Sequence, residues 1–211
     1  MNPMNEASPV VFIVDDDPIV CTSMKRLIRT LGLEVRTFAS AREFLQARRP
    51  DGPGCLVLDV RMPELSGLDL QQELTHANID LPIIFVTGHA DVPMSVRAMK
   101  AGAVEFLTKP FREQDLLEAV QHGIGRHRES LERHAEILEL QQRHDSLTPR
   151  ERDVFPLVAS GLLNKQIADQ LGASEKTIKT HRGQLMRKMH AESLADLVRM
   201  FERLKLASLK S

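Results

Sequence analysis

The chain has 211 residues, of which 42% are hydrophobic, and a formal net charge of −1, so it can form one large or two small globular domains. Its only cysteines, Cys21 and Cys55, are too few for a disulfide framework and suit a reducing compartment. The N-terminal stretch MNPMNEASP lacks the features of a signal peptide, and no apolar run approaches the roughly 20 residues of a membrane helix. We therefore expect a cytoplasmic protein that has no membrane partner.

Short apolar runs in the first 110 residues predict the strands of a parallel sheet. They cover residues 10–14, 33–38, 55–60, 82–88 and 103–110. Most are continuous rather than alternating in polarity, which is typical of strands that are covered on both faces. Helical patterns follow the strands, beginning at Pro18, at a capping box of Ser40 and Glu43, and over residues 66–77, 91–102 and 112–123. This order predicts a flavodoxin-like, doubly wound (βα)5 domain of the α/β class over residues 1–125.

The next segment, residues 126–145, is polar and consists mainly of good helix formers without proline. It predicts a linker helix that continues the fifth helix. Ile124, Leu131 and Leu138 recur every seven residues, so a coiled-coil dimer seam is the alternative, although the intermediate positions are polar.

The two ends of the chain differ in net charge. Residues 146–211 hold 12 Lys and Arg against 7 Asp and Glu, a net charge of +5, whereas the remainder carries −6. This asymmetry indicates two domains with different partners. Helical patterns over residues 149–160, 164–171, 174–189 and 193–206 predict a small all-α domain over residues 146–211. The second and third of these patterns, joined at Gly172, indicate a helix-turn-helix.

Polar side chains stand where the predicted strands end. Asp15 and Asp16 follow the first strand, Asp59 lies in the third run, Thr87 in the fourth and Lys109 in the fifth. Ligands of an open parallel sheet bind at this edge. Clustered carboxylates need a cation, and Mg²⁺ prefers carboxylate and phosphate oxygens. Asp59 can then attack phosphorus, while Lys109 and Thr87 neutralise the transferring group.

This pattern resembles a response-regulator receiver domain over about residues 9–125. The resemblance implies that Asp59 is the phosphoacceptor of a sensor histidine kinase. It also implies that Asp16 and Asp15 bind Mg²⁺ together with Asp59 and the backbone carbonyl of Arg61. Lys109 and Thr87 would bind the phosphoryl group.

Further implications of the resemblance are that Phe106 is the aromatic switch residue and that the peptide between Lys109 and Pro110 is cis. Asp17 is expected to serve only as a helix N-cap. A haloacid-dehalogenase-like phosphatase also uses a strand-end aspartate, but it needs a second acid two residues later. Arg61 occupies that position, so this alternative fails.

The basic C-terminal segment resembles a LuxR-type helix-turn-helix, and the whole chain a FixJ/NarL-class response regulator, with FixJ, TodT and StyR as the nearest types. The residues that we expect on the outer face of the recognition helix are Lys176, Thr177, Lys179, Thr180, Arg182, Arg187 and Lys188. By resemblance, Lys179 and Thr180 face base edges, whereas Lys165, Thr177 and Arg182 contact phosphate. Gly183 departs from the family pattern, in which a basic residue is common.

Together these features predict a transcriptional regulator that a histidine kinase phosphorylates on Asp59 and that binds promoter DNA as a dimer. RNA polymerase is a further candidate partner. The dimer face on DNA is expected on the last helix, with Leu194, Leu197, Val198 and Phe201. The chain is not expected to be an enzyme beyond self-phosphorylation and slow autodephosphorylation. The alternatives are a constitutive DNA-binding protein with a vestigial receiver and an enzyme that acts on a small phosphate ester.

Overall fold

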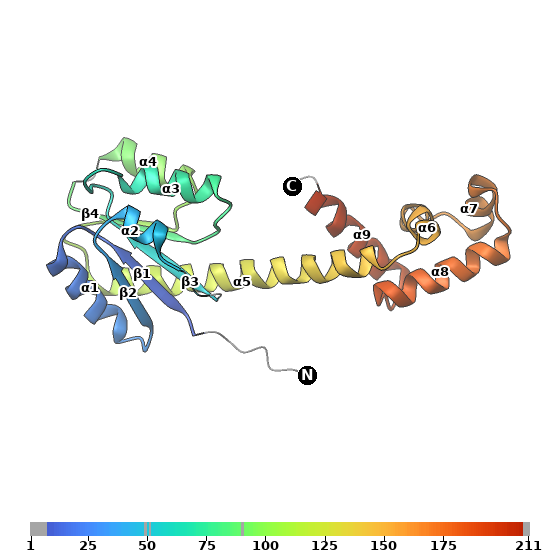
Figure 1. Cartoon of the computed structure of the whole chain (residues 1–211), viewed down its shortest axis with the longest axis horizontal. Coiled ribbons are helices and arrows are strands. Elements are labelled where there is room, and N and C mark those ends of the chain that lie inside the picture. Colours follow the sequence, from blue (N-terminus) through green and yellow to red (C-terminus); the bar gives the residue numbers. More distant parts are fainter. Residues whose placement is uncertain (1–7, 49, 51, 90, 209–211) are drawn as a thin grey trace. The chain divides into compact units, whose positions relative to one another are not determined.

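The computed structural model describes residues 8–48, 50, 52–89 and 91–208 (Figure 1). Residues 1–7, which belong to the stretch without signal-peptide features, lie outside this range. The chain divides into two compact units, Met1–Glu132 and Arg133–Ser211. None of the described helices is both long enough and apolar enough to cross a membrane.

A sheet of five parallel strands forms the centre of the first unit, in the order β2-β1-β3-β4-β5 (Figure 1). The strands are β1 (Val10–Val14), β2 (Glu34–Phe38), β3 (Gly54–Leu58), β4 (Ile83–Thr87) and β5 (Glu105–Thr108). All residues of β1, β3 and β4 are buried, as the continuous apolar runs predict for strands that are covered on both faces. The register places Val10 opposite both Glu34 and Gly54, so β1 and β3 end side by side.

The helices that follow the strands are α1 (Pro18–Arg29), α2 (Ala41–Gln46), α3 (Gly67–His76), α4 (Val92–Lys100) and α5 (Glu113–Asp145). Apolar residues of α1 and α5, such as Ile28 and Leu116, share one buried cluster with the sheet. Phe44 of α2, Leu70 of α3 and Ala98 of α4 belong to the cluster on the other face. Two helical layers therefore cover the sheet, which confirms the doubly wound α/β fold.

Polar side chains fix where these helices begin. The Asp17 carboxylate accepts hydrogen bonds from the backbone N–H groups of Ile19 and Val20, which confirms its role as the N-cap of α1. The Ser40 hydroxyl accepts from the Glu43 N–H in the same way at α2. These side chains satisfy donors that have no partner within the helix.

The fifth helix runs without a break for 33 residues, from Glu113 to Asp145, so the predicted linker helix does continue it. Its middle part is fastened to the first unit. The Gly54 N–H donates to Nδ1 of His127 over 2.9 Å, and the Ser130 hydroxyl donates to the Asp80 carboxylate. Burial lowers the pKa of His127, which favours the neutral ring that can accept a hydrogen bond. Ile124 is buried in the core, so it does not belong to an exposed coiled-coil seam.

The second unit contains the end of α5 together with α6 (Pro149–Ala159), α7 (Asn164–Leu171), α8 (Glu175–Met189) and α9 (Leu194–Ser208). Thr148 and Glu151 form the capping box that begins α6. Gly172 ends α7 with a φ of +63°, a left-handed conformation that suits glycine. The helices enclose one core, to which Leu140, Phe155, Ile167 and Leu185 contribute.

The expected dimer face on α9 is wrong for Leu197, whereas Phe201 is only half-buried. Leu197 is fully buried in the core of the second unit. The Phe201 ring lies against that of Phe155, with 5.1 Å between centroids. The helical period places these residues on one face, but α6 already covers that face. Leu194 remains exposed.

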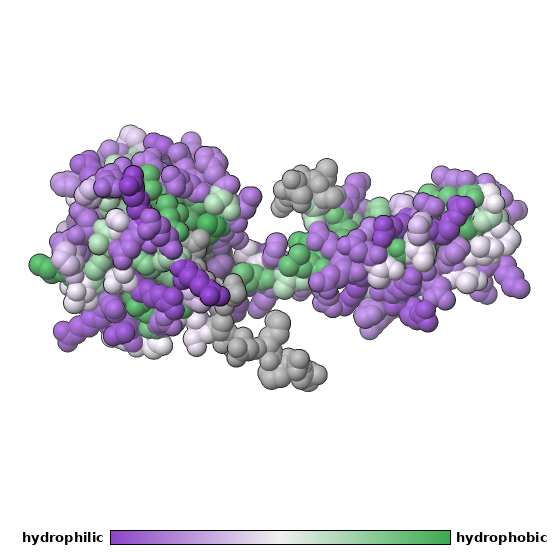
Figure 2. Space-filling view, viewed as in Figure 1, coloured by the Kyte–Doolittle hydropathy of each residue, from purple (hydrophilic) through white to green (hydrophobic). Residues whose placement is uncertain are grey.

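Both cysteines are free and buried, as expected from their number. Burial raises the pKa of the Cys55 thiol to about 12. Burial and the charge of Asp15 also raise the pKa of Cys21. The face of each unit that Figure 2 shows is mainly hydrophilic, with smaller apolar areas.

Candidate functional site

The acidic pocket lies at the carboxyl ends of the central strands. Asp15 directly follows β1, and its N–H donates to the Phe38 carbonyl of β2 over 3.2 Å. Asp59 directly follows β3, and its N–H donates to the Val14 carbonyl over 2.9 Å. These bonds extend the sheet ladder by one residue, so the backbone of both acids is fixed where their side chains leave the sheet.

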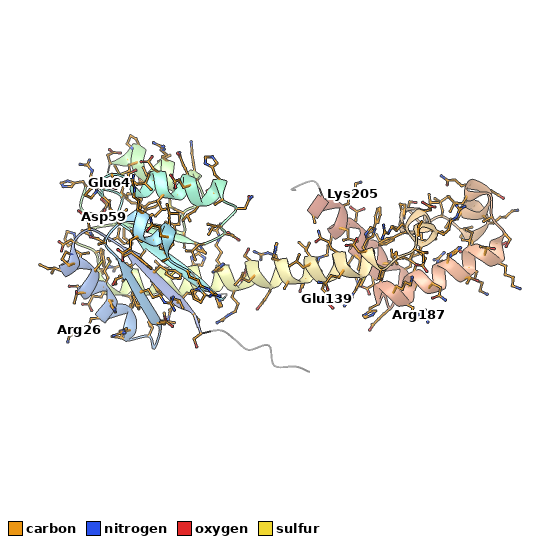
Figure 3. The ribbon with its side chains drawn as sticks, in the orientation of Figure 1. Arg26, Asp59, Glu64, Glu139, Arg187 and Lys205 are labelled. Carbon is orange, nitrogen blue, oxygen red and sulfur yellow. The ribbon has the colours of Figure 1, made fainter. Side chains whose placement is uncertain are left out.

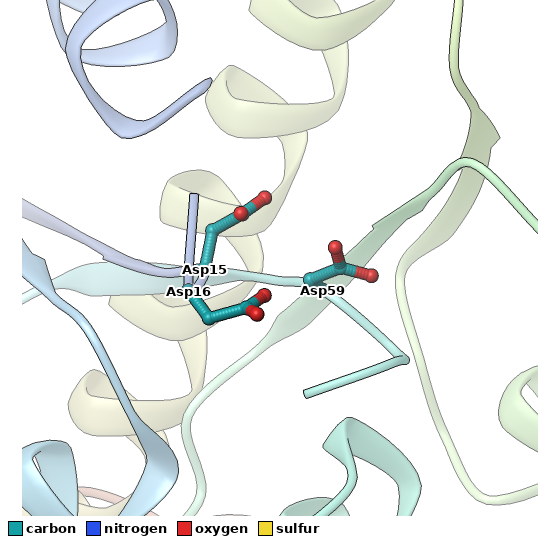
Figure 4. A group of neighbouring side chains, drawn as sticks. All are labelled: Asp15, Asp16 and Asp59. Atoms are coloured by element: carbon teal, nitrogen blue, oxygen red, sulfur yellow. The ribbon is translucent and has the colours of Figure 1, made fainter. Parts of the chain in front are cut away.

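Three carboxylates share this edge of the sheet. One oxygen each of Asp15, Asp16 and Asp59 lies within 4.8 Å of the others (Figure 4). Asp15 is 1% exposed, whereas Asp16 is exposed to solvent. Burial raises the pKa of Asp15, and the charge of Asp59 adds to this, although hydrogen bonds from Lys109 and the Asp17 N–H act in the opposite direction. Burial is thus the main cause of the raised pKa, while the three neighbouring carboxylates carry more charge than Lys109 alone can neutralise.

Lys109 is the cation that the protein itself supplies to this pocket. Its Nζ lies 2.7 Å from Oδ2 of Asp15 and 3.2 Å from Oδ2 of Asp59. The backbone N–H of Lys109 donates to the Thr87 carbonyl over 2.8 Å, which continues the pairing of β5 with β4. Burial lowers the pKa of Lys109, but the hydrogen bond and charges of the two aspartates outweigh this effect and raise it overall. One ammonium facing three carboxylates leaves a donor set that is compatible with Mg²⁺.

The other predicted residues of the pocket follow β3 or lie on β4 and β5. Thr87 is 1% exposed, and its Oγ1 accepts from the His89 N–H over 3.3 Å. The Arg61 N–H donates to Oδ1 of Asp59 over 3.1 Å, while a metal contact of the Arg61 carbonyl stays a prediction. Phe106 is half-buried, with its ring centroid 6.0 Å from that of Phe85. The peptide between Lys109 and Pro110 is cis, as expected.

Gly67 is a residue of this site that the sequence did not single out. A Cβ atom on Gly67 would lie 2.2 Å from the Asp59 carbonyl oxygen, closer than atoms can approach. The Gly67 N–H also donates to the Val60 carbonyl over 3.0 Å, which closes the loop after Asp59. In the sequence, Ser66 and Gly67 indicate only the start of a helix. Nothing in that pattern predicts the close approach of Gly67 to the Asp59 carbonyl.

The recognition helix α8 of the second unit presents an exposed basic face. Lys176, Thr177, Lys179 and Thr180 are exposed, whereas Ile178 on the opposite side is buried. The Ser174 hydroxyl caps the helix by accepting from the Thr177 N–H over 3.1 Å. The Thr180 hydroxyl donates to the Lys176 carbonyl over 3.1 Å.

Two basic residues on α8 differ from the expectation of a uniform outer face. Lys188 is not part of it, because its Nζ contacts the buried Glu151 carboxylate at 2.7 Å. Arg182 is half-buried and donates to Oδ1 of Asn164 at the start of α7 over 3.3 Å, so it ties the two helices together. Lys165 on α7 is exposed, as expected for a phosphate contact.

Comparison with known proteins defines the class. Residues 11–121 match the response regulator receiver domain, and residues 145–201 match the luxR family of bacterial regulatory proteins. The chain therefore belongs to the response regulators that join a receiver to a LuxR-type DNA-binding domain. It is a two-component transcriptional regulator, and these domains imply a histidine kinase and DNA as partners.

Individual relatives cover nearly all of the chain. Nodulation protein W of Bradyrhizobium diazoefficiens is 54% identical over 92% of this chain and 86% of its own. Response regulator protein TmoT of Ectopseudomonas mendocina is 48% identical over 96% of this chain and 92% of its own. The solved structure of the response regulator StyR, 49% identical, covers 93% of this chain and 100% of its own with a TM-score of 0.82.

Proposed function

We propose that the chain is a phosphorylation-activated transcriptional regulator. A histidine kinase transfers a phosphoryl group to Asp59 in the presence of Mg²⁺, and the phosphorylated protein binds promoter DNA as a dimer. The observation that supports this most strongly is the convergence of three carboxylates at the strand ends, two of which contact one partly buried ammonium.

Each residue of the pocket has a role in this proposal. A carboxylate oxygen of Asp59 forms a bond to phosphorus while the bond from phosphorus to the imidazole nitrogen of the donor breaks, and the imidazole leaves. Lys109 and Thr87 bind the phosphoryl oxygens. Asp15, Asp16, Asp59 and the Arg61 carbonyl would hold Mg²⁺, which supplies positive charge against those oxygens. Apart from this reaction and slow autodephosphorylation, the chain performs no catalysis.

Acetyl phosphate and Mg²⁺ provide the test, with the intact mass of the protein as the readout. The wild type gains one phosphoryl group, and Asp59→Asn gains none. Asp16→Ala loses most of the rate and its dependence on Mg²⁺, whereas Asp169→Asn, an exposed acid on α7, behaves as the wild type. Phosphorylation of Asp59→Asn on another residue would contradict the site. An unmodified wild type would favour the vestigial receiver, and turnover of the ester without a modified protein would favour an enzyme.

In this proposal, Thr87 and Phe106 transmit the phosphorylation of Asp59 to the rest of the first unit. A phosphoryl group on Asp59 draws the Thr87 hydroxyl inward, and Phe106 turns into the vacated space. The face of α4 then pairs with a second receiver through Val92, Val96 and Lys100, all of which are exposed. Sedimentation at micromolar concentration should show a larger species only after phosphorylation. An unchanged sedimentation coefficient would contradict this mechanism.

DNA binding uses the exposed face of α8. Lys179 and Thr180 contact base edges, while Lys165, Lys176, Thr177 and Arg182 serve as further DNA contacts, largely to phosphate. A two-fold dimer requires an inverted repeat with half-site centres about 10 base pairs apart or a small multiple of that.

Two lysine variants separate base contacts from phosphate contacts. Lys179→Ala should cost about 1–3 kcal/mol on the specific site and relax its sequence preference. Lys165→Ala should weaken binding to all sequences alike and reduce the salt dependence by about one phosphate contact. Binding is measured on specific and scrambled DNA at several salt concentrations. If Lys179→Ala loses the same factor of affinity on specific and on scrambled DNA, Lys179 does not contact base edges.

A further inference from the structure

The last turns of α5 are built into the DNA-binding unit. Leu140 is 6% exposed and belongs to the same buried cluster as Phe155 of α6 and Leu185 of α8. Glu136, one turn earlier, forms an ion pair with Arg203 of α9. The support of the helix-turn-helix therefore begins about ten residues before the segment that the sequence assigns to it.

Arg143 connects this part of α5 to the end of the recognition helix. Its Nη1 donates to the carbonyl of Met189, the last residue of α8, over 3.3 Å. Its Nη2 donates to Glu139, one turn earlier on α5, over 2.6 Å. Figure 3 shows Glu139 on α5 and Arg187 near the end of α8. The last carbonyls of a helix lack partners within it and carry partial negative charge, so a guanidinium is favourable there.

A second contact holds the same end of α8. The Nζ of Lys188 donates to the carbonyl of Ser146, directly after α5, over 3.2 Å, as well as to Glu151. Two neighbouring residues of α8 are thus fastened to the end of α5 and to the loop that follows it. The buried side chains Ile178 and Leu185 determine how deeply α8 sits in the core, and these polar contacts restrain its far end.

The length of α8 makes its direction important for base contacts. Lys179 lies ten residues before Met189, or about 15 Å along the helix, so a rotation of about 5° around the C-terminal end moves it by about 1.3 Å. Lys179 and Thr180 lie in the first half of the helix. Hydrogen bonds to base edges depend on narrow ranges of distance and angle, whereas attraction to the phosphate backbone is largely electrostatic and depends less on such a shift.

We infer that Arg143 is a positioning residue for sequence recognition: by holding the Met189 carbonyl against α5, it sets the direction of α8 and hence the placement of Lys179 and Thr180. The inference rests on the proposed base contacts of these two residues. It predicts that loss of Arg143 reduces discrimination between DNA sequences more than it reduces general affinity for DNA.

The experiment uses the full chain and DNA that the wild type selects from a randomised pool, with a scrambled fragment for comparison. Arg143→Met keeps the apolar stem and removes the donors. Its ratio of affinities for selected over scrambled DNA should fall roughly fivefold or more, while its affinity for scrambled DNA stays within about twofold of the wild type. Arg128→Met, an exposed arginine on α5 in the first unit, is the matched control and should leave both affinities unchanged.

Thermal unfolding verifies that each variant is folded. Should Arg143→Met fail to fold, Arg143→Lys, which has one donor group instead of a fork, decides the question by the same ratio. A wild-type ratio, or an equal loss on both DNAs, would overturn the inference. Lys179→Ala on the same fragments tests the base contacts separately. If Lys179→Ala keeps its ratio while Arg143→Met lowers it, the assignment of Lys179 fails and the role of Arg143 remains.

Discussion

The two units each contain one buried carboxylate that is paired with a lysine at 2.7 Å, Asp15 with Lys109 and Glu151 with Lys188. The pairs have similar exposure, but the pKa of their acids moves in opposite directions. Burial raises the pKa of Asp15, and Asp59 adds to this. At Glu151 burial also acts upward, but hydrogen bonds from Lys188 and the Thr148 N–H outweigh it and lower the pKa.

Burial is the main cause of the raised pKa at Asp15, and the two pairs also differ in the charges that surround them. Glu151 meets one lysine and the backbone donor of its capping box, so its charge is balanced and its role is to join α6 to α8. Asp15 shares its lysine with Asp59 and lies beside Asp16, so negative charge is in excess. A close lysine–carboxylate pair alone therefore does not distinguish the proposed phosphorylation site from a structural contact, whereas the excess of carboxylates over cations does.

The largest predicted difference between the two pairs appears when each lysine is replaced in turn. Lys188→Met leaves Glu151 buried without a counter-charge, and we expect the free energy of unfolding of the second unit to fall by about 3 kcal/mol. Lys109→Met also removes a counter-charge, but Mg²⁺ should restore much of the stability that this variant loses. Mg²⁺ should restore none of the stability that Lys188→Met loses. Chemical denaturation with and without Mg²⁺ measures both effects.

A double variant serves as the control for the structural pair. Glu151→Gln combined with Lys188→Met removes the uncompensated charge and should recover part of the stability lost in Lys188→Met. If Mg²⁺ stabilises the two single variants equally, the distinction between the pairs is wrong.

A smaller effect is expected from relieving the excess charge directly. Asp16→Asn removes one of three neighbouring carboxylates and should raise the stability of the first unit by up to about 1 kcal/mol in the absence of Mg²⁺. The same change should reduce the stabilisation that Mg²⁺ confers. Thermal unfolding across a Mg²⁺ titration provides the measurement, and a destabilised Asp16→Asn protein would contradict an excess of charge.

The smallest effect concerns a half-buried histidine that accepts a hydrogen bond in its neutral form. Since the pKa of His127 is lower in the folded chain than its ordinary value of 6.5, the unfolded chain binds the proton more readily. This contribution to stability is complete above pH 6.5 and is lost as the pH falls from there toward the folded pKa. His127→Gln should therefore lose less stability than the wild type between about pH 7.5 and 5.5. Equal pH dependence of the two proteins would show that His127 is not held neutral.

Much of the first unit could be predicted because parallel strands bring their carboxyl ends to one edge. Asp15, Asp59, Thr87 and Lys109 are far apart in the sequence, yet the strand pattern alone places them together. Helix starts at Asp17, Ser40 and Thr148 were equally clear, since capping is a local interaction.

The second unit was harder to predict because the direction of a side chain on a helix depends on its neighbours. Lys188 looked like part of the exposed basic face, and only the burial of Glu151 explains why it turns toward α6. The helical pattern alone left Leu197 free to contact a partner, but in the structure α9 packs against α6 and buries this side chain. Arg143 gave no sign of its contact with Met189, because that contact joins helices that are far apart in the sequence.

The burial of both native thiols also makes the chain convenient for site-specific labelling. With its pKa raised to about 12, Cys55 holds almost no thiolate at neutral pH, and the pKa of Cys21 is raised as well. A cysteine introduced at an exposed position such as Val92 should therefore react with a maleimide dye long before either native thiol. The sequence also contains no tryptophan or tyrosine, so a single tryptophan placed at position 106 would dominate the intrinsic fluorescence and report on its own surroundings.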